Sequence, residues 1–168
     1  MQRIKYVLYA LTFTTSLWLI TAVAHAGDYI TGYAGYFNIG QDFDSPQFGI
    51  EYRGDLWRYD IRPIIGINVN TDGGVYGYAG LHWDWSIAQS WWLIPNFAVG
   101  AYSQGDSEDL GGALEFRSGL ELAYEFEDTS RVGIAFNHIS NASIYDDNPG
   151  AETLMFTYSY PLGGLFHR

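Results

Sequence analysis

The chain has 168 residues, no cysteine and a formal net charge of −11 at pH 7. The lack of cysteine excludes disulfides, thiolate metal sites and cysteine nucleophiles. The acidic balance repels nucleic acid, so we expect no nucleic-acid partner. The length suits one domain of ordinary size.

The N-terminal segment has the organisation of a secretory signal peptide. Two basic residues precede an apolar run, and Ala24 and Ala26 form an Ala-x-Ala pattern that predicts cleavage before Gly27. A membrane anchor is the alternative, which the threonines inside the run disfavour. We therefore expect a signal peptide over residues 1–26 and one exported domain over 27–168. That domain would hold six arginines, no lysine and all nineteen acidic residues.

Apolar and polar side chains alternate along eight segments of the expected domain, which is the period of a β-strand. In one of them, 114–126, apolar residues alternate with charged ones throughout most of the segment. Together with export and a high aromatic content, an even number of such segments predicts an all-β, eight-stranded antiparallel transmembrane β-barrel. Its apolar face would meet lipid and its charged face would fill the lumen. The expected strands are 29–38, 47–54, 57–69, 75–86, 91–103, 114–126, 131–140 and 152–162.

The connections between these strands differ in length. Short connections are expected at 55–56, 88–90 and 127–130, and longer ones at 39–46, 103–112 and 141–151, with the short turn 70–74 as the exception among the latter. Outer-membrane barrels keep short turns on the periplasmic side and longer loops outside. We therefore expect both termini in the periplasm and the domain in the outer membrane.

The strand expected at 131–140 carries polar residues where its apolar row ends. His138 and Ser140 follow the apolar residues of the outward face, and Glu152 begins the outward row of the next strand. A hairpin would bring Glu152 opposite this pair. Serine, histidine and an acid in this order can act as nucleophile, base and orienting group. The pattern alone leaves open that they only mark the headgroup boundary, where polar residues cost about 0–1 kcal/mol.

Other polar residues are expected inside the barrel. His82, Asp84 and Ser86 form a second trio of suitable composition, but their strand places them in the lumen near the periplasmic end. A hydrogen-bond network is the expected role of that trio. Buried charges need partners, so the charged residues that line the lumen should pair with one another across it. This expectation concerns Glu115, Arg117, Glu121 and Glu125, with Arg53, Asp60 and Arg62 as candidate partners.

The segment 138–143, "HISNAS", resembles the active-site segment of the outer-membrane lipid A 3-O-deacylases of the PagL type, with Glu152 following at the start of the last strand. The likeness extends more loosely over most of the expected domain. It implies that Ser140 is the nucleophile, His138 the general base and Glu152 the orienting acid. It also implies an oxyanion hole formed by Asn141 and the backbone amides after it, beginning with Ala142. The chain departs from the family pattern at Ser143, where a glycine is expected.

The resemblance further implies hydrolysis of the ester-linked 3-hydroxyacyl chain at position 3 of lipid A, the membrane anchor of lipopolysaccharide, in the outer leaflet. No metal and no organic cofactor are implied. A non-catalytic structural or adhesive barrel is the alternative, and an acyltransferase or phospholipase with the same nucleophile is a third candidate, because the fold cannot separate them. A homodimer is left open.

Overall fold

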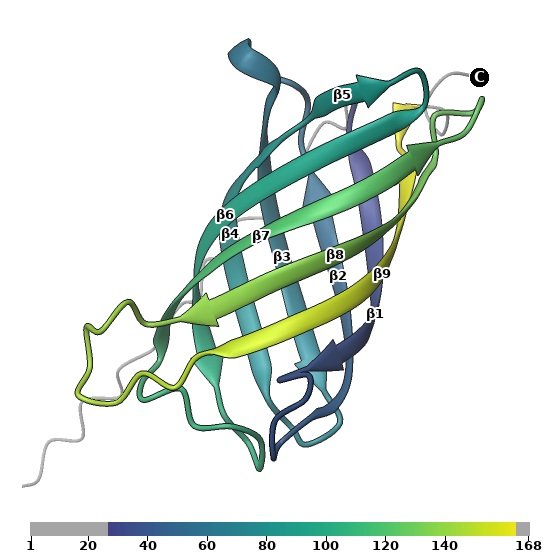
Figure 1. Ribbon diagram of the computed structural model, residues 1–168. Coiled ribbons are helices and arrows are strands. Elements are labelled where there is room, and N and C mark those ends of the chain that lie inside the picture. Colours follow the sequence, from purple (N-terminus) through teal and green to yellow (C-terminus); the bar gives the residue numbers. More distant parts are fainter. Residues whose placement is uncertain (1–26, 164–168) are drawn as a thin grey trace, which may run out of the picture.

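A computed structural model describes residues 27–163, so the expected signal peptide and the last five residues lie outside the described part. The described chain forms a single antiparallel sheet of tilted strands (Figure 1). Among residues 27–163, no helix is long and apolar enough to cross a membrane. The strands are β1 (Tyr29–Phe37), β2 (Ser45–Arg53), β3 (Ile61–Asn70), β4 (Val75–Trp83), β5 (Trp85–Ala88), β6 (Trp91–Ser103), β7 (Leu114–Glu125), β8 (Arg131–Ser140) and β9 (Ala151–Pro161), with one 3-10 turn, η1 (Arg58–Asp60).

The sheet closes on itself into a barrel. Each strand except β4 pairs with the next strand along the chain, β1 pairs with β9, and β4 pairs with β6 rather than with β5. The short β5 follows β4 after a one-residue break at Asp84 and pairs only with β6. Because β4 and β5 together occupy one position around the wall, the barrel has eight strands, and the predicted fold is confirmed.

Two strands differ from the sequence prediction by three residues or more at one end, and the other strand ends agree within two residues. The fourth strand was expected to run unbroken through residue 86, but it stops where the Asp84 carboxylate turns inward to accept hydrogen bonds from Arg62 and Arg131, both at 2.8 Å. The third strand was expected from residue 57, but Tyr59 and Asp60 have positive φ angles of 64° and 59° and form η1 instead. The connection before β3 therefore covers 54–60 and is longer than expected.

The outer wall of the barrel is apolar, as predicted. Along the strands other than β5, buried residues alternate with exposed or half-buried ones, and the exposed members are mostly large aliphatic and aromatic side chains. Trp91, Tyr124 and Phe126 form an edge-to-face row near one end, with ring centroids 5.3 Å apart in each pair. An apolar band with aromatic residues at its border is the lipid-facing surface of an outer-membrane barrel.

The lumen is filled by charged side chains that pair with one another. Glu51 accepts from Arg53 at 2.9 Å and from Arg117 at 3.1 Å, and it also accepts the hydroxyl groups of Tyr33 and Tyr78. The guanidinium carbon of Arg117 lies 3.9 Å from the centre of the Tyr78 ring. This arrangement satisfies buried charges that would otherwise be costly.

The charged row of β7 faces the lumen, as predicted, but of the three expected partners only Arg53 pairs with it, and Arg62 binds Asp84 instead. Glu121 accepts from Arg53 at 2.7 Å, so that expected pairing is confirmed, and Glu125 accepts from Arg131 at 2.8 Å. Asp60 was also expected as a partner, but it is exposed because η1 lifts it out of the strand. Glu115 is buried, and its carboxylate has no hydrogen-bond partner among residues 27–163.

The two ends of the barrel differ, and we name them by their connections. The long-loop end, at the bottom of Figure 1, carries the connections 38–44, 104–113 and 141–150 together with the short turn 71–74. The short-turn end carries the remaining connections. It also holds the start of β1 and the end of β9, where the N–H of Leu162 donates to the carbonyl of Asp28. The side chains considered next lie at the long-loop end.

Candidate active site

His138 and Glu152 are direct cross-strand partners on β8 and β9. The Nδ1 atom of His138 lies 3.0 Å from an Oε1 atom of Glu152, and the two side chains are 45% and 35% exposed. Both belong to the outward rows of their strands. The residues on either side of His138, Asn137 and Ile139, are buried, and so are the residues on either side of Glu152, Ala151 and Thr153. The hairpin therefore brings together the histidine and the acid that the sequence placed on the outer wall.

Ser140 is the last residue of β8 and shares the outward row with His138. Two residues on a strand place their Cα atoms about 6.6–6.8 Å apart. The Ser140 hydroxyl makes no hydrogen bond to His138 within the described part of the chain. Rotation of these two half-exposed side chains can close that gap, since catalytic hydrogen bonds often tighten only when substrate is bound.

A tight turn follows Ser140 directly. The N–H of Ile144 donates to the carbonyl of Asn141 at 3.1 Å, and the two residues between them, Ala142 and Ser143, have positive φ angles of 54° and 60°. Two consecutive left-handed residues define a type I′ turn. The N–H groups of Ala142 and Ser143 have no acceptor among residues 27–163, and both residues are exposed. Two free backbone donors thus lie one and two residues beyond the Ser140–Asn141 peptide.

Asn141 itself is fully buried and faces inward. Its side-chain Nδ2 donates to the carbonyl of Leu110 at 2.7 Å and to that of Asp147 at 2.8 Å, and its backbone N–H donates to Oδ1 of Asn148 at 3.0 Å. Both amide hydrogens of the side chain are therefore used within the protein. In this arrangement Asn141 ties the connection 104–113 to the connection 141–150, a role that the sequence did not reveal.

Two glycines complete the contact between these connections. Gly111 has a φ angle of 87°, and a Cβ atom there would collide with the carbonyl of Asp147. A Cβ atom at Gly112 would collide with the ring of Tyr145, whose hydroxyl accepts from the N–H of Leu114 at 3.2 Å. The connection 104–113 therefore holds the segment after Ser140 in place.

An apolar groove opens beside Ser140 on the outer wall. It has a volume of about 320 Å³ and is lined by Phe97, Phe116, Ser118, Ser140 and Ala142. The rings of Phe97 and Phe116 are stacked with centroids 6.1 Å apart. Phe116 is the direct cross-strand partner of Ser140. The groove can hold a hydrocarbon chain with one end at the Ser140 hydroxyl.

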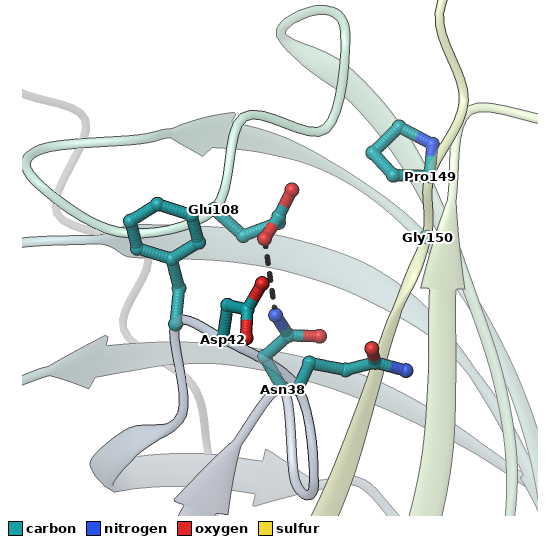
Figure 2. Close-up of a pocket in the computed structure, with 7 residues that line it drawn as sticks. Asn38, Asp42, Glu108, Pro149 and Gly150 are labelled. Atoms are coloured by element: carbon teal, nitrogen blue, oxygen red, sulfur yellow. Dashed lines mark hydrogen bonds between the residues drawn. The ribbon is translucent and has the colours of Figure 1, made fainter.

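A second, polar pocket lies at the mouth of the barrel (Figure 2). Its volume is about 280 Å³, and Asp42 and Glu108 lie on one side of it while Pro149 and Gly150 lie on the other. Nδ2 of Asn38 donates to Glu108 at 3.2 Å. Across residues 27–163, no cluster of three or more histidine and acidic side chains is arranged to hold a metal ion.

The second trio considered in the sequence is not assembled. His82 and Asp84 are buried in the lumen, where Nε2 of His82 lies 3.5 Å from Oε1 of Glu51. Ser86 was expected beside them, but it is exposed and its hydroxyl donates to the carbonyl of Ala88 at 3.3 Å. The register of β4 on β6 continues into β5, so Ser86 keeps the same face as His82 but lies at the open short-turn end, where it is exposed. His138, Ser140 and Glu152 are therefore the candidate catalytic side chains.

Known proteins resemble this chain in sequence and in fold. A family model described as lipid A 3-O-deacylase (PagL) matches residues 9–161. The chain belongs to the lipid A 3-O-deacylase family. Membership makes it a lipid A deacylase, a hydrolase of the outer membrane.

Individual relatives of this deacylase family are distant in sequence. The lipid A deacylase PagL of Bordetella bronchiseptica is 23% identical and aligns with 74% of this chain and 76% of its own. The crystal structure of the outer membrane enzyme PagL superposes with a TM-score of 0.61 at 21% identity, over 79% of this chain and 99% of that one. A de novo designed transmembrane β-barrel superposes with a TM-score of 0.52 at 9% identity, over 81% and 98%. At such identities the superpositions show the shared barrel fold.

Proposed function

We propose that this deacylase cleaves the ester-linked 3-hydroxyacyl chain at position 3 of lipid A with Ser140 as nucleophile, His138 as general base and Glu152 as the acid that orients the imidazole. The 3.0 Å contact between His138 and Glu152 carries the proposal, because it fixes one imidazole nitrogen as the donor. The other nitrogen, Nε2, is then free to accept the proton of Ser140.

The reaction follows from these roles. Nε2 of His138 takes the hydroxyl proton as Ser140 Oγ bonds to the ester carbonyl carbon, and the carbonyl oxygen becomes an oxyanion. The imidazolium, stabilised by Glu152, gives the proton to the sugar oxygen as the ester C–O bond breaks. Water then attacks the acyl-serine by the same proton transfers. The products are the sugar alcohol and a free 3-hydroxy fatty acid, and Ser140 regains its proton.

We propose that the oxyanion is bound by the backbone N–H groups of Ala142 and Ser143. Both donors are unused within the described chain and lie on adjacent residues of the turn after the nucleophile. Ala142 keeps the role that the family resemblance implied. For Asn141 we propose a positioning role, since its amide hydrogens are donated to Leu110 and Asp147. Preorganised donors of this kind contribute without reorganisation at the moment of reaction.

The location on the outer wall explains how such a substrate is reached. The lumen is filled with paired charges, so an acyl chain cannot enter it. The groove beside Ser140 is open to the membrane, and the stacked rings of Phe97 and Phe116 offer an apolar wall to the hydrocarbon. All the site residues come from one chain, so the mechanism needs no second copy.

Mass spectrometry of lipid A tests the proposal. Cells expressing the chain should lose one 3-hydroxyacyl group per lipid A, and cells expressing Ser140→Ala should not. His138→Ala should lose nearly as much activity, because nucleophile and base act as a unit. The matched control is Ser118→Ala, which removes a hydroxyl from the same groove and should retain deacylation. Unchanged deacylation by Ser140→Ala would exclude Ser140 as nucleophile, and fatty-acid release from glycerophospholipids alone would favour a phospholipase.

A further inference from the structure

Gly150 lies against the imidazole of His138. It is buried, it precedes β9 directly, and its φ angle is 72°. A Cβ atom built on Gly150 would lie 2.8 Å from Cε1 of His138 and 3.5 Å from Nε2. Cε1 is the ring atom between the two nitrogens. Gly150 therefore faces the edge of the imidazole that carries both nitrogens proposed to act in catalysis.

The imidazole therefore has a close neighbour at two adjacent ring positions. Glu152 contacts Nδ1 at 3.0 Å, and the bare Cα of Gly150 faces Cε1. Carbon atoms in contact are normally about 3.5–4.0 Å apart, so a methyl group at 2.8 Å would force the ring to move. Moving the ring changes the geometry of both nitrogens at once.

We infer that Gly150 is a positioning residue for His138, and that it lacks a side chain so that the imidazole can face Glu152 with one nitrogen and Ser140 with the other. This inference rests on the proposed role of His138. Gly150 also lines the polar pocket at the barrel mouth (Figure 2).

A second glycine separates this inference from a purely conformational one. A positive φ angle favours glycine whatever lies nearby. Gly40, in the neighbouring connection 38–44, has a φ angle of 78° and is exposed, and no atom lies within 4 Å of the Cβ position. Alanine at Gly40 meets the same backbone strain as alanine at Gly150 without meeting an imidazole. Comparing Gly150→Ala with Gly40→Ala therefore separates the effect of the ring contact from the effect of backbone strain.

The experiment compares Gly150→Ala, Gly40→Ala and Ser140→Ala as purified full-length proteins in detergent micelles with lipid A as substrate. Because a displacement of about 1 Å can cost on the order of 10²-fold in rate, we expect kcat of Gly150→Ala to fall by about that factor with little change in KM. Gly40→Ala should stay within about twofold of the parent, since its added methyl group meets no other atom. Equal kcat values in the two glycine variants would overturn the inference.

A spectroscopic measurement tests the contact without catalysis. The imidazole ¹⁵N signals of His138, identified by their loss in His138→Gln, should shift in Gly150→Ala and stay in place in Gly40→Ala. Unshifted signals in Gly150→Ala would also overturn the inference. If Ser140→Ala keeps the parent's rate, the proposed mechanism fails, while the NMR result still decides whether Gly150 positions the ring.

A double-mutant cycle covers the case in which Gly150→Ala does not fold. His138→Ala removes the ring, so the combination His138→Ala with Gly150→Ala should fold as well as His138→Ala with Gly40→Ala. Recovery of folding in that background would assign the defect to the imidazole contact. Failure to fold even without the ring would assign it to the backbone and overturn the inference.

Discussion

Replacing Asn141 by alanine tests whether this residue positions the site or donates to the oxyanion. The substitution removes two hydrogen bonds, to the carbonyl groups of Leu110 and Asp147. Each is worth about 0.5–1.5 kcal/mol net, and a buried carbonyl left without a partner costs about 1–3 kcal/mol. The substitution also removes the buried Oδ1 atom of Asn141, which has no partner within residues 27–163. Removal of this atom offsets part of the lost free energy. We expect the contact between 104–113 and 141–150 to weaken by about 2–4 kcal/mol.

The matched variant is Gly112→Ala. It disrupts the same contact through the ring of Tyr145, but it removes no donor. If Asn141 acts by positioning, both variants should lower kcat, and both should increase hydrogen exchange and proteolysis in 104–113. Ester hydrolysis in micelles and mass-spectrometric hydrogen exchange are the two assays.

One combination of results would refute the positioning role. A single lost oxyanion donor costs about 10²–10³ in turnover without loosening the structure. If Asn141→Ala loses activity in that range while exchange in 104–113 stays at the parent's level and Gly112→Ala remains active, the Asn141 side chain must reach the oxyanion directly.

Three further outcomes are expected. Ser143→Gly should stabilise the protein by up to about 1 kcal/mol, because glycine adopts the positive φ angle of 60° without the strain that serine has there. Thermal unfolding measures this change, and a loss of stability would contradict the proposed strain at Ser143. Asp84→Asn should destabilise the barrel by about 3–5 kcal/mol in urea titrations, because Arg62 and Arg131 lose a shared charge, while the folded fraction keeps its activity; an unchanged midpoint would contradict the pairing. Phe116→Ala should lower kcat/KM for the long-chain ester roughly 10- to 100-fold by removing groove surface, with a smaller effect on a short-chain ester; equal losses for both would argue against acyl binding in the groove.

The sequence predicted those parts of the molecule that depend on alternation. Because side chains alternate between the faces of a strand, the outward row of β8 and the charged row of β7 could be read directly. The closeness of His138 and Glu152 followed from one hairpin. The strand break at Asp84 could not be predicted, because it depends on Arg62 and Arg131 from two other strands.

The connections at the long-loop end were beyond sequence reasoning for a related reason. Asn141 binds the carbonyl groups of Leu110 and Asp147, and backbone carbonyls are present at every residue, so they leave no pattern in the sequence. The role of Gly150 depends on a contact with His138 twelve residues earlier in the chain.

The paired charges that fill the lumen also bear on the route of water, the second reactant of the hydrolysis. In the proposed mechanism water must cleave the acyl-serine, and Ser140 lies on the outer wall, whereas the guanidinium of Arg117, stacked on Tyr78 and bound to Glu51, lies in the lumen. Water can then reach the acyl-serine from the exterior across the exposed turn at Ala142 and Ser143. The departing sugar alcohol lies on that same side. In that mechanism the acyl group can return to the sugar until the sugar leaves, so the rate of its exit sets how often cleavage becomes irreversible.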